Sequence, residues 1–309
     1  KGNSLKNNET STEIIKGVFT TCKKRDGCPP WELSANKILH DKKEKKIKYD
    51  NATLRIYDYP IVYFPKFFHP DPTVKRKSGF LIPSLTDSSN SGNYLSLPYF
   101  KVISENKDFT FTPRLYASDK ILLQTEYRQA TKNSKSILDF SFLNEKNKSS
   151  KNHFFYNLDR NLNFNFFDDI NLKLKIEKTS NDTYLRFNNL NSDIINNTSV
   201  LENSLDVDMY SEDFSVDANL TIFEDLDKDK SDRYEFILPQ INLTKKLNNR
   251  TNLNGDFILK SNNLIKNYQT NIFEKINTNN LIFNSNPTIT NRGFYNNYEF
   301  IIKNINVKW

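Results

Sequence analysis

Apolar and polar side chains alternate through most of the chain after Pro83, and this alternation limits the possible folds more than any other feature. Successive side chains of a β-strand point to opposite faces, so the alternation predicts strands with one apolar and one polar face. Helical periodicity is nearly absent. The clearest case sets Phe154, Tyr156, Leu158, Leu162, Phe164 and Phe166 against Asn157, Asp159, Asn161, Asn163 and Asn165.

We count about eleven or twelve such segments between Phe109 and Val307, which predicts an all-β, antiparallel architecture. The alternation is equally typical of a soluble sandwich with one wet face. However, the segments are long for a sandwich, no covering helix is visible, and the polar sides carry rows of charge or asparagine. A transmembrane β-barrel has such a polar lumen, and its closure removes the exposed edges of an open sheet. The sequence therefore favours a barrel.

A proline-rich stretch precedes the alternating region. Proline fixes its own φ and has no N–H, so this stretch cannot form the interior of a helix or of a central strand. Together with the basic residues that follow it, the stretch is predicted to be a hinge between two β structures; the alternative is a long ordered loop on a β-sandwich. Its prolines are Pro60, Pro65, Pro70, Pro72 and Pro83.

Before the prolines, short strands are predicted at Trp31–Leu39, Lys46–Asp50 and Ala52–Tyr57, with polar turns between them. This rhythm fits the stacked rungs of a β-jellyroll or β-taco. We therefore divide the chain into residues 1–59 as the end of a jellyroll, 60–83 as a connector, and 84–309 as barrel strands.

The connector carries a specific motif. It comprises Pro60-Ile-Val-Tyr-Phe-Pro65, then Pro70-Asp-Pro72, then Arg76-Lys77-Ser78-Gly79-Phe80-Leu-Ile-Pro83. This motif closely resembles the lipopolysaccharide-assembly outer-membrane protein family (LptD, also called OstA or Imp). In that family the segment joins a periplasmic β-jellyroll to a large transmembrane β-barrel. The match extends upstream through Thr20-Thr21-Cys22, Trp31-Glu-Leu-Ser-Ala35, His40-Asp41 and Asn51-Ala52, and covers roughly residues 18 to 100.

The resemblance implies transport rather than catalysis. A glycolipid, lipopolysaccharide, would slide along an apolar jellyroll groove, pass its head group into the barrel lumen and leave through the barrel seam. The family acts in the outer membrane, with a periplasmic N-terminal portion. Its partners are a lipoprotein plug of the LptE type inside the barrel and a periplasmic bridge protein of the LptA type. Neither an enzymatic role nor a cofactor is implied.

The resemblance also assigns residues. Pro83 and Pro98 match the family's prolines at the first barrel strands, where the seam opens sideways. Each proline deletes a ladder hydrogen bond and so weakens the edge that must part; alternatively, Pro83 merely starts a strand and Pro98 marks a bulge. The remaining candidates are Pro60, Pro65 and Gly79 as hinge residues, and Arg76, Lys77, Ser78 and Phe80 as motif residues.

Cys22 and Cys28 are the chain's two cysteines. By the resemblance, Cys22 falls on a family cysteine that pairs near the C-terminus of the full-length protein, and this chain holds no such partner. A local bridge between Cys22 and Cys28 and two separate long-range pairs both stay open.

Other functional classes find little support. His40, His69 and His153 lack metal-ligand spacing, and Ser78-Gly79 lacks the context of a hydrolase nucleophile. The net charge of +7 suggests nucleic acid, but the basic residues are scattered, so no nucleic-acid partner is expected. The acidic run Glu224, Asp225, Asp227 and Asp229 lacks the glycine and the spacing of a calcium loop.

Two alternatives from other classes are a substrate-specific, porin-like channel of the outer membrane and a soluble β-sandwich binding module. A porin would lack both the jellyroll and the connector. Because the family's barrel is large, roughly twenty-six strands, we expect a fragment truncated at both ends that forms an open, curved sheet. The aromatic Trp309 favours the opposite view, in which it ends a small complete barrel.

Overall fold

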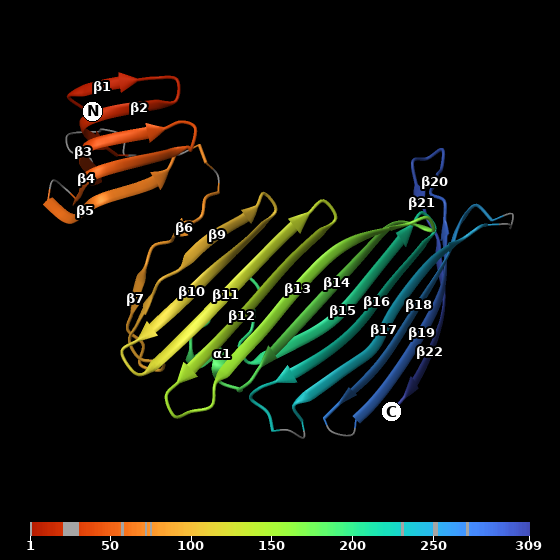
Figure 1. Ribbon diagram of the computed structural model, residues 1–309. Helices are drawn as coiled ribbons and strands as arrows, with labels where there is room; N and C mark the ends of the chain where they lie inside the picture. Colours follow the sequence, from red (N-terminus) through yellow and green to blue (C-terminus); the bar gives the residue numbers. More distant parts are fainter. Residues whose placement is uncertain are drawn as a thin grey trace. The chain divides into compact units, whose positions relative to one another are not determined.

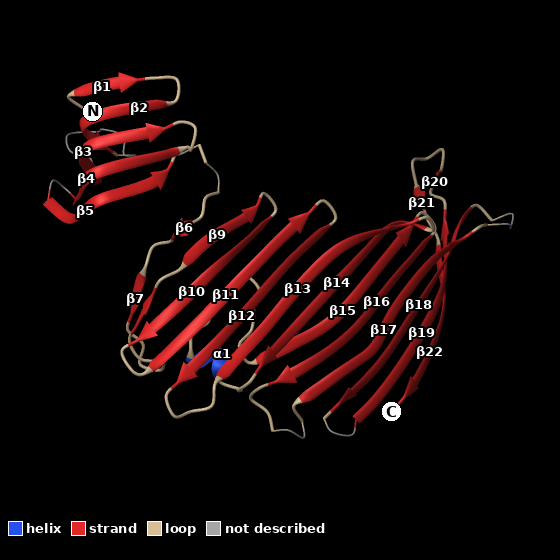
Figure 2. Ribbon diagram, viewed as in Figure 1, coloured by secondary structure: helices blue, strands red, loops and turns tan. Residues whose placement is uncertain are grey.

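The computed structural model describes residues 2–20, 31–56, 59–71, 73–74, 76–229, 232–249, 253–269 and 272–309. It divides into two compact units, residues 1–77 and 78–309. Strands dominate both units, and the helix in the described part is the one-turn α1 (Tyr184–Phe187) (Figure 2). Within the described residues, no helix has the length and the apolar character needed to cross a membrane. The predicted all-β, antiparallel fold is confirmed.

The first unit is one antiparallel sheet in which each strand pairs with the next along the chain (Figure 1). Its strands are β1 (Ser4–Asn7), β2 (Ser11–Phe19), β3 (Trp31–Asp41), β4 (Lys46–Ile56) and β5 (Tyr59–Pro70). A single apolar cluster lies on one side of this sheet. Its buried members are Leu33, Ala35, Ile38, Ile47, Tyr49 and Ala52.

A corner crosses this sheet and changes which side chains are buried. In β3 the buried side chains are Leu33 and Ala35 and then Ile38; in β4 they are Ile47 and Tyr49 and then Ala52. The register between β4 and β5 leaves out Asn51 and Pro65 at this corner. Asn51 has a φ of 52°, in the left-handed region that asparagine tolerates. The corner therefore lets residues of both parities line the same hollow.

Strand β5 occupies part of the segment that the sequence predicts to be a connector, residues 60–83. Pro60 and Pro65 lie in β5, which pairs with β4 and forms an edge of the first sheet. Edge strands accept proline because its missing N–H need not break a ladder on the open side. The boundary between the units falls later, between Lys77 and Ser78.

The second unit is a fifteen-stranded antiparallel sheet with a small hairpin of β20 (Thr288–Ile289) and β21 (Tyr295–Asn296) beside it. Neighbouring long strands follow chain order, and within the described residues the end strands β7 and β22 do not pair with each other. The strands of the large sheet are β6 (Gly79–Phe80), β7 (Ser84–Thr86), β8 (Tyr94–Ser96), β9 (Tyr99–Ser104), β10 (Lys107–Tyr116), β11 (Lys120–Thr131), β12 (Ser134–Glu145), β13 (Lys151–Phe164), β14 (Phe167–Thr179), β15 (Val200–Ser211), β16 (Phe214–Asp225), β17 (Tyr234–Leu247), β18 (Gly255–Tyr268), β19 (Ile272–Ser285) and β22 (Glu299–Lys308).

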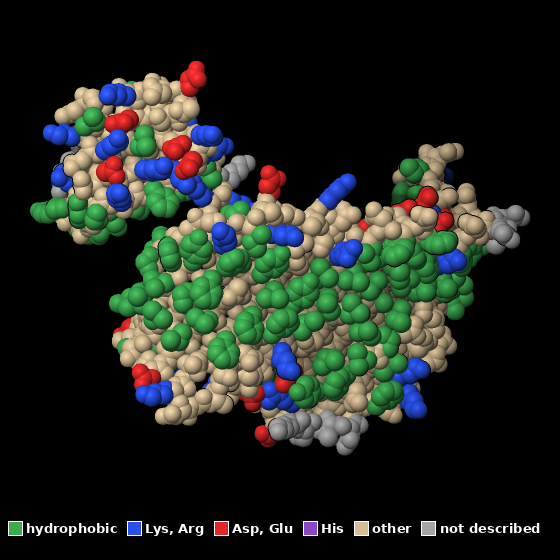
Figure 3. Space-filling view, in the orientation of Figure 1, with side chains coloured by type: hydrophobic (Ala, Val, Ile, Leu, Met, Phe, Trp, Pro, Cys, Tyr) green, Lys and Arg blue, Asp and Glu red, His purple; other side chains and the backbone are tan. Residues whose placement is uncertain are grey.

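The two faces of this sheet differ. Residues 180–199, including α1, pack against one face, which we call the inner face; His153 and Phe155 of β13 are buried beneath them. Phe154, Tyr156 and Leu158 alternate with these residues and point to the opposite, outer face. Hydrophobic side chains gather in a band across the outer face (Figure 3). In β13 the alternation thus places apolar side chains on the outer face, as the sequence predicted.

Connections differ in length between the two ends of the sheet. At one end, two-residue turns at 105–106, 132–133, 165–166 and 212–213 join the strands. The other end carries the longer connections 146–150, 180–199 and 226–233. Beyond β17 this difference disappears, because the short-turn end there carries residues 248–254 and 286–298.

Candidate functional site

An apolar groove of about 500 Å³ lies on the buried side of the first unit. Residues from both sides of the corner line the groove, because the corner turns their side chains to the same face. Its lining residues are Phe19, Trp31, Leu33, Leu54, Phe64, Phe67, His69 and Pro70. Several rings contact one another, with centroids 5.0 Å apart for Phe19 and His69 and 5.1 Å for Phe64 and Phe67.

His69 is the polar side chain of this lining, and both of its ring nitrogens are engaged. Nδ1 lies 2.6 Å from the Pro70 carbonyl oxygen, which can only accept, so Nδ1 donates. Nε2 of the neutral ring then accepts from the Tyr49 hydroxyl at 2.7 Å. Burial raises the pKa of Tyr49, which keeps this hydroxyl protonated. The groove therefore offers apolar surface and suits an apolar chain better than a polar ligand.

Pro83 and Pro98 lie on the two sides of one gap in the sheet. Pro83 separates β6 from β7, and Pro98 separates β8 from β9. Pairing is limited to Gly79 and Phe80 with β9 and to Ser84–Thr86 with β8. Within the gap, the Leu81 N–H donates to the Pro98 carbonyl at 2.8 Å. The structure thus brings the two predicted prolines together at the weakest-paired edge of the sheet.

The basic motif is divided between the two units. The Lys77 ammonium donates to the carbonyl oxygens of Glu44 and Lys45 in the first unit, at 3.4 and 3.3 Å. The Ser78 hydroxyl accepts the Val102 N–H in the second unit at 2.9 Å. Consecutive residues are therefore tied to different units.

The other predicted residues have simpler surroundings. Phe80 packs edge-on against Tyr99, with 5.0 Å between the ring centroids. A side chain added at Gly79 would meet nothing within 4 Å, so sterics there do not demand glycine. Arg76 is exposed in the segment before β6. Cys22 and Cys28 lie outside the described residues.

His40 contacts Asp71, which directly follows β5. The pKa of Asp71 is lowered, first by the hydrogen bond from the Thr73 N–H and then by the Thr73 hydroxyl and His40. This contact ties the start of the segment between the units to β3. Across the described ranges, no three His, Cys, Asp or Glu side chains are grouped as metal ligands.

A buried polar network on the inner face was not anticipated from the sequence. His153 Nε2 lies 3.0 Å from Asp139 Oδ1, and His153 Nδ1 lies 2.6 Å from Ser141 Oγ. The Tyr184 hydroxyl of α1 lies 2.7 Å from the same Ser141 Oγ. The Gln124 amide donates to both oxygens of Asp139. With a neutral imidazole, every hydrogen bond is donated towards the Asp139 carboxylate, which can only accept.

The order Asp139, His153, Ser141 matches that of a hydrolase triad, yet all three side chains are fully buried. Tyr184 covers the serine hydroxyl, so a substrate cannot reach it. The network instead links residues 180–199 to the inner face of the sheet.

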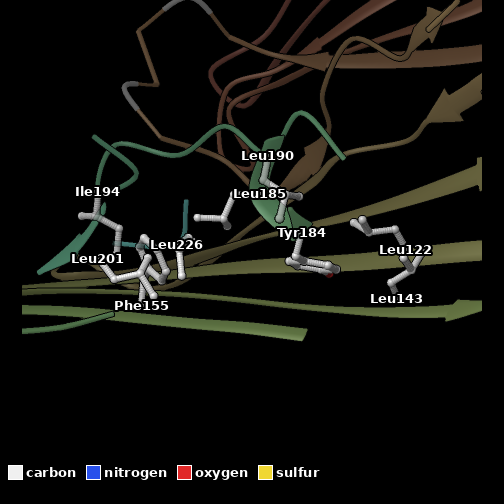
Figure 4. Close-up of a cluster of buried hydrophobic side chains, with 9 residues drawn as sticks. All are labelled: Leu122, Leu143, Phe155, Tyr184, Leu185, Leu190, Ile194, Leu201 and Leu226. Carbon is white, nitrogen blue, oxygen red and sulfur yellow. The ribbon is translucent and has the colours of Figure 1, made fainter. Parts of the chain in front are cut away.

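Apolar and polar contacts support this fastening. Tyr184 and Leu185 of α1 lie over the strands that carry Leu122, Leu143 and Phe155 (Figure 4). The Arg114 guanidinium donates to the Asn188 carbonyl at 2.6 Å, Gln124 to the Asn191 carbonyl at 3.2 Å, and Ser192 to Glu126 at 2.8 Å. The sequence signal was the apolar content of the connection, namely Tyr184, Leu185, Leu190, Ile194 and Ile195.

Comparison with known proteins identifies relatives of part of the chain. No protein family model matches it. It is 34% identical to the LPS-assembly protein LptD of Pseudomonas putida over 154 residues, 49% of the chain. It is 31% identical to LptD of Shewanella denitrificans over 221 residues, 67% of the chain, and 31% identical to LptD of Pseudomonas aeruginosa over 163 residues, 52%.

These matches confirm the resemblance to LptD that the connector motif indicated. The chain spans only a minor part of the relatives, 16% of the Pseudomonas putida protein and 28% of the Shewanella denitrificans protein.

The Tyr184→Phe variant should loosen residues 180–199 while keeping the packed ring. Loss of one partner in a buried network costs about 1–3 kcal/mol. Trypsin should therefore cleave after Arg186 about fivefold faster or more, because cleavage follows the population of the opened state. Tyr210→Phe, which removes an exposed hydroxyl, is the control. Equal cleavage rates in the two variants would show that the network does not hold the segment.

Proposed function

Because about half of the chain is similar to LptD proteins, we propose that it is a segment of an outer-membrane translocon for lipopolysaccharide. The observation that carries this proposal is the combination of two surfaces in one chain. The first unit has an apolar groove, and the second has a sheet with an apolar band on its outer face and polar inner-face residues such as Asn157, Asp159 and Asn161. An amphipathic lipid needs both kinds of surface.

In this proposal the groove shields acyl chains from water. Transfer of apolar surface out of water supplies the affinity for acyl chains. Because the hydrophobic effect is not directional, an acyl chain can slide along the groove. His69 does not compete for the ligand, since both of its ring nitrogens are engaged within the protein. The groove supplies no energy for movement of the lipid, so another component must supply that energy.

The large sheet is proposed to be barrel wall, with its outer face against lipid and its inner face towards the lumen. Outer-membrane barrels have short periplasmic turns and longer loops at the cell surface. By this rule the two-residue turns lie on the periplasmic side, and residues 180–199 return from the surface side onto the lumen face. The N-terminal unit is then periplasmic.

The proline gap is proposed to be the lateral gate. Strands β6 to β9 share few ladder pairs, whereas β10 and β11 pair continuously from Lys107 to Leu115. Parting the gap breaks fewer hydrogen bonds than parting any complete strand pair. Pro83 and Pro98 maintain this weakness because neither can donate.

Two protein partners follow from the same proposal. An LptA-type bridge protein would add to the free edge strand of the jellyroll, since an edge strand presents backbone groups for β-augmentation. An LptE-type lipoprotein would occupy the lumen against the polar inner face. Both partners are drawn from the family resemblance.

Groove binding is tested in the full-length protein by Leu54→Glu. A carboxylate in the groove should disfavour acyl chains, and each 1.4 kcal/mol lost lowers the affinity about tenfold. Photo-cross-linking of lipopolysaccharide to the first unit should fall about tenfold or more. Thr53→Glu, the neighbouring position on the opposite face, should retain cross-linking. Equal cross-linking in the two variants would rule out the groove as the acyl-chain path.

Insertion of the wall is tested by Leu158→Arg on the outer face and Asn161→Arg on the inner face. Arginine against the bilayer interior costs about 2–4 kcal/mol, whereas a lumen site accepts it readily. Reversible unfolding of the full-length protein from lipid vesicles measures both changes. If the two substitutions cost the same, the outer face does not meet lipid.

The gate is tested by replacing Pro83 and Pro98 together with alanine. Each new N–H can close part of the gap, and each hydrogen bond contributes about 0.5–1.5 kcal/mol. Export of lipopolysaccharide to the cell surface should fall while the folded protein persists. Pro287→Ala, outside the strands, is the control. Unchanged export in the double variant would refute the gate.

A further inference from the structure

A polar patch interrupts the apolar outer face on β18, β19 and β22. Its members, which we call the amide patch, are Ser261, Asn263, Asn277, Asn279, Asn304 and Asn306. The register fixes their direction. Asn171, Asp208, Asp217, Asn242 and Asn262 are successive cross-strand partners on the inner face. Ser261 and Asn263 flank Asn262 in β18, so they and their partners point outwards.

The amides are linked to one another. Ser261 Oγ donates to Asn279 Oδ1 at 2.7 Å, and Asn279 Nδ2 donates to Asn277 Oδ1 at 2.6 Å. In β22, Asn306 Nδ2 donates to Asn304 Oδ1 at 2.6 Å. Each amide has two N–H donors and two acceptor lone pairs, so these bonds leave capacity for a ligand. The patch is therefore an ordered array of donors and acceptors.

Position, rather than composition, distinguishes the patch. The outward partners of Asn263 and Ser261 in β17 are Ile241 and Leu243. The outer face thus changes from apolar to polar between β17 and β18 at the same register. If the patch only reflected a high overall asparagine content, asparagine would also be expected at the outward positions of β17.

The surroundings of the patch are amphipathic. Towards the start of β18 lies a hollow of about 280 Å³ lined by Leu253, Phe257, Leu281, Phe283, Phe300 and Ile302. In the opposite direction, Lys275 of β19 pairs in register with Lys308 of β22 and follows the patch on the same face. The outward residues of these three strands, all within the described residues, include no Asp or Glu. Apolar, amide and cationic surfaces therefore follow one another along the strands.

We propose that this outer surface binds the head group of a phosphorylated glycolipid of the surrounding membrane. The amides suit sugar hydroxyls, which both donate and accept, and the two lysines suit phosphate. An acyl chain lies against the apolar hollow. The proposal depends on the outer face meeting lipid, as in the proposed function, but not on the groove or the gate.

The test uses the full-length protein in nanodiscs of phosphatidylcholine with a bis-phosphorylated diglucosamine lipid as probe. A photoreactive residue at Ile302 reports binding at the outer surface alone. Lys275→Gln with Lys308→Gln should lower cross-linking about tenfold or more, since a lysine near an anionic head group contributes about fivefold. The control is Lys260→Gln with Lys303→Gln, two inward lysines on the same strands, which should leave the yield unchanged.

Two further arms separate recognition from charge alone. The dephosphorylated probe and phosphatidylglycerol should each cross-link less than the phosphorylated glycolipid. Asn279→Leu with Asn304→Leu should remove the preference for the glycolipid over phosphatidylglycerol. Equal yields in the two lysine variants, or equal yields for glycolipid and phosphatidylglycerol in the parent protein, would overturn the proposal. Failure of membrane insertion itself would appear separately, as equal unfolding costs for Leu158→Arg and Asn161→Arg.

Discussion

The backbone ladder between antiparallel strands is the interaction on which the rest of the structure depends. In the described part of the chain, nearly every long strand pairs with the next one, so most backbone N–H and C=O groups of these strands find partners on a neighbouring strand. Proline is tolerated only where this ladder can lose a donor. Pro60 and Pro65 lie on an edge strand, Pro239 lies at a register shift, and Pro83 and Pro98 lie on the two sides of one gap.

The two units use the same alternation in opposite ways. In strands of the large sheet such as β13, alternation continues along the strand, and apolar side chains such as Phe154 and Leu158 stay outside. In the first unit, the corner at Asn51 and Pro65 changes the parity of the buried residues, so that apolar side chains from both halves of a strand face one hollow. A local change in backbone direction therefore explains why the first unit forms an apolar groove, whereas the large sheet does not.

The inner face carries its own core, which is mixed in character. A one-turn helix cannot hold itself in place, because helix nucleation is unfavourable. Residues 180–199 are held by apolar packing of Tyr184 and Leu185 and by the buried network of Asp139, His153 and Ser141. Burial of these polar groups is tolerated because they hydrogen-bond one another. The hydrogen bonds resemble those of a hydrolase triad, but here they link a buried segment to the sheet.

The sequence by itself determined the all-β class, the alternation along the strands, the family resemblance and the positions, at Pro83 and Pro98, that lack an N–H. These properties are local: alternation and missing N–H groups act within a strand. The tertiary structure alone decided that Pro60 and Pro65 belong to β5 and that Tyr184 joins His153 and Ser141. It also decided that the asparagines of β18, β19 and β22 face outwards while Asn262 faces inwards. Those outcomes depend on the register between strands and on the return path of a long loop. Neither is set by residues adjacent in sequence, because one shift in register turns a whole strand over.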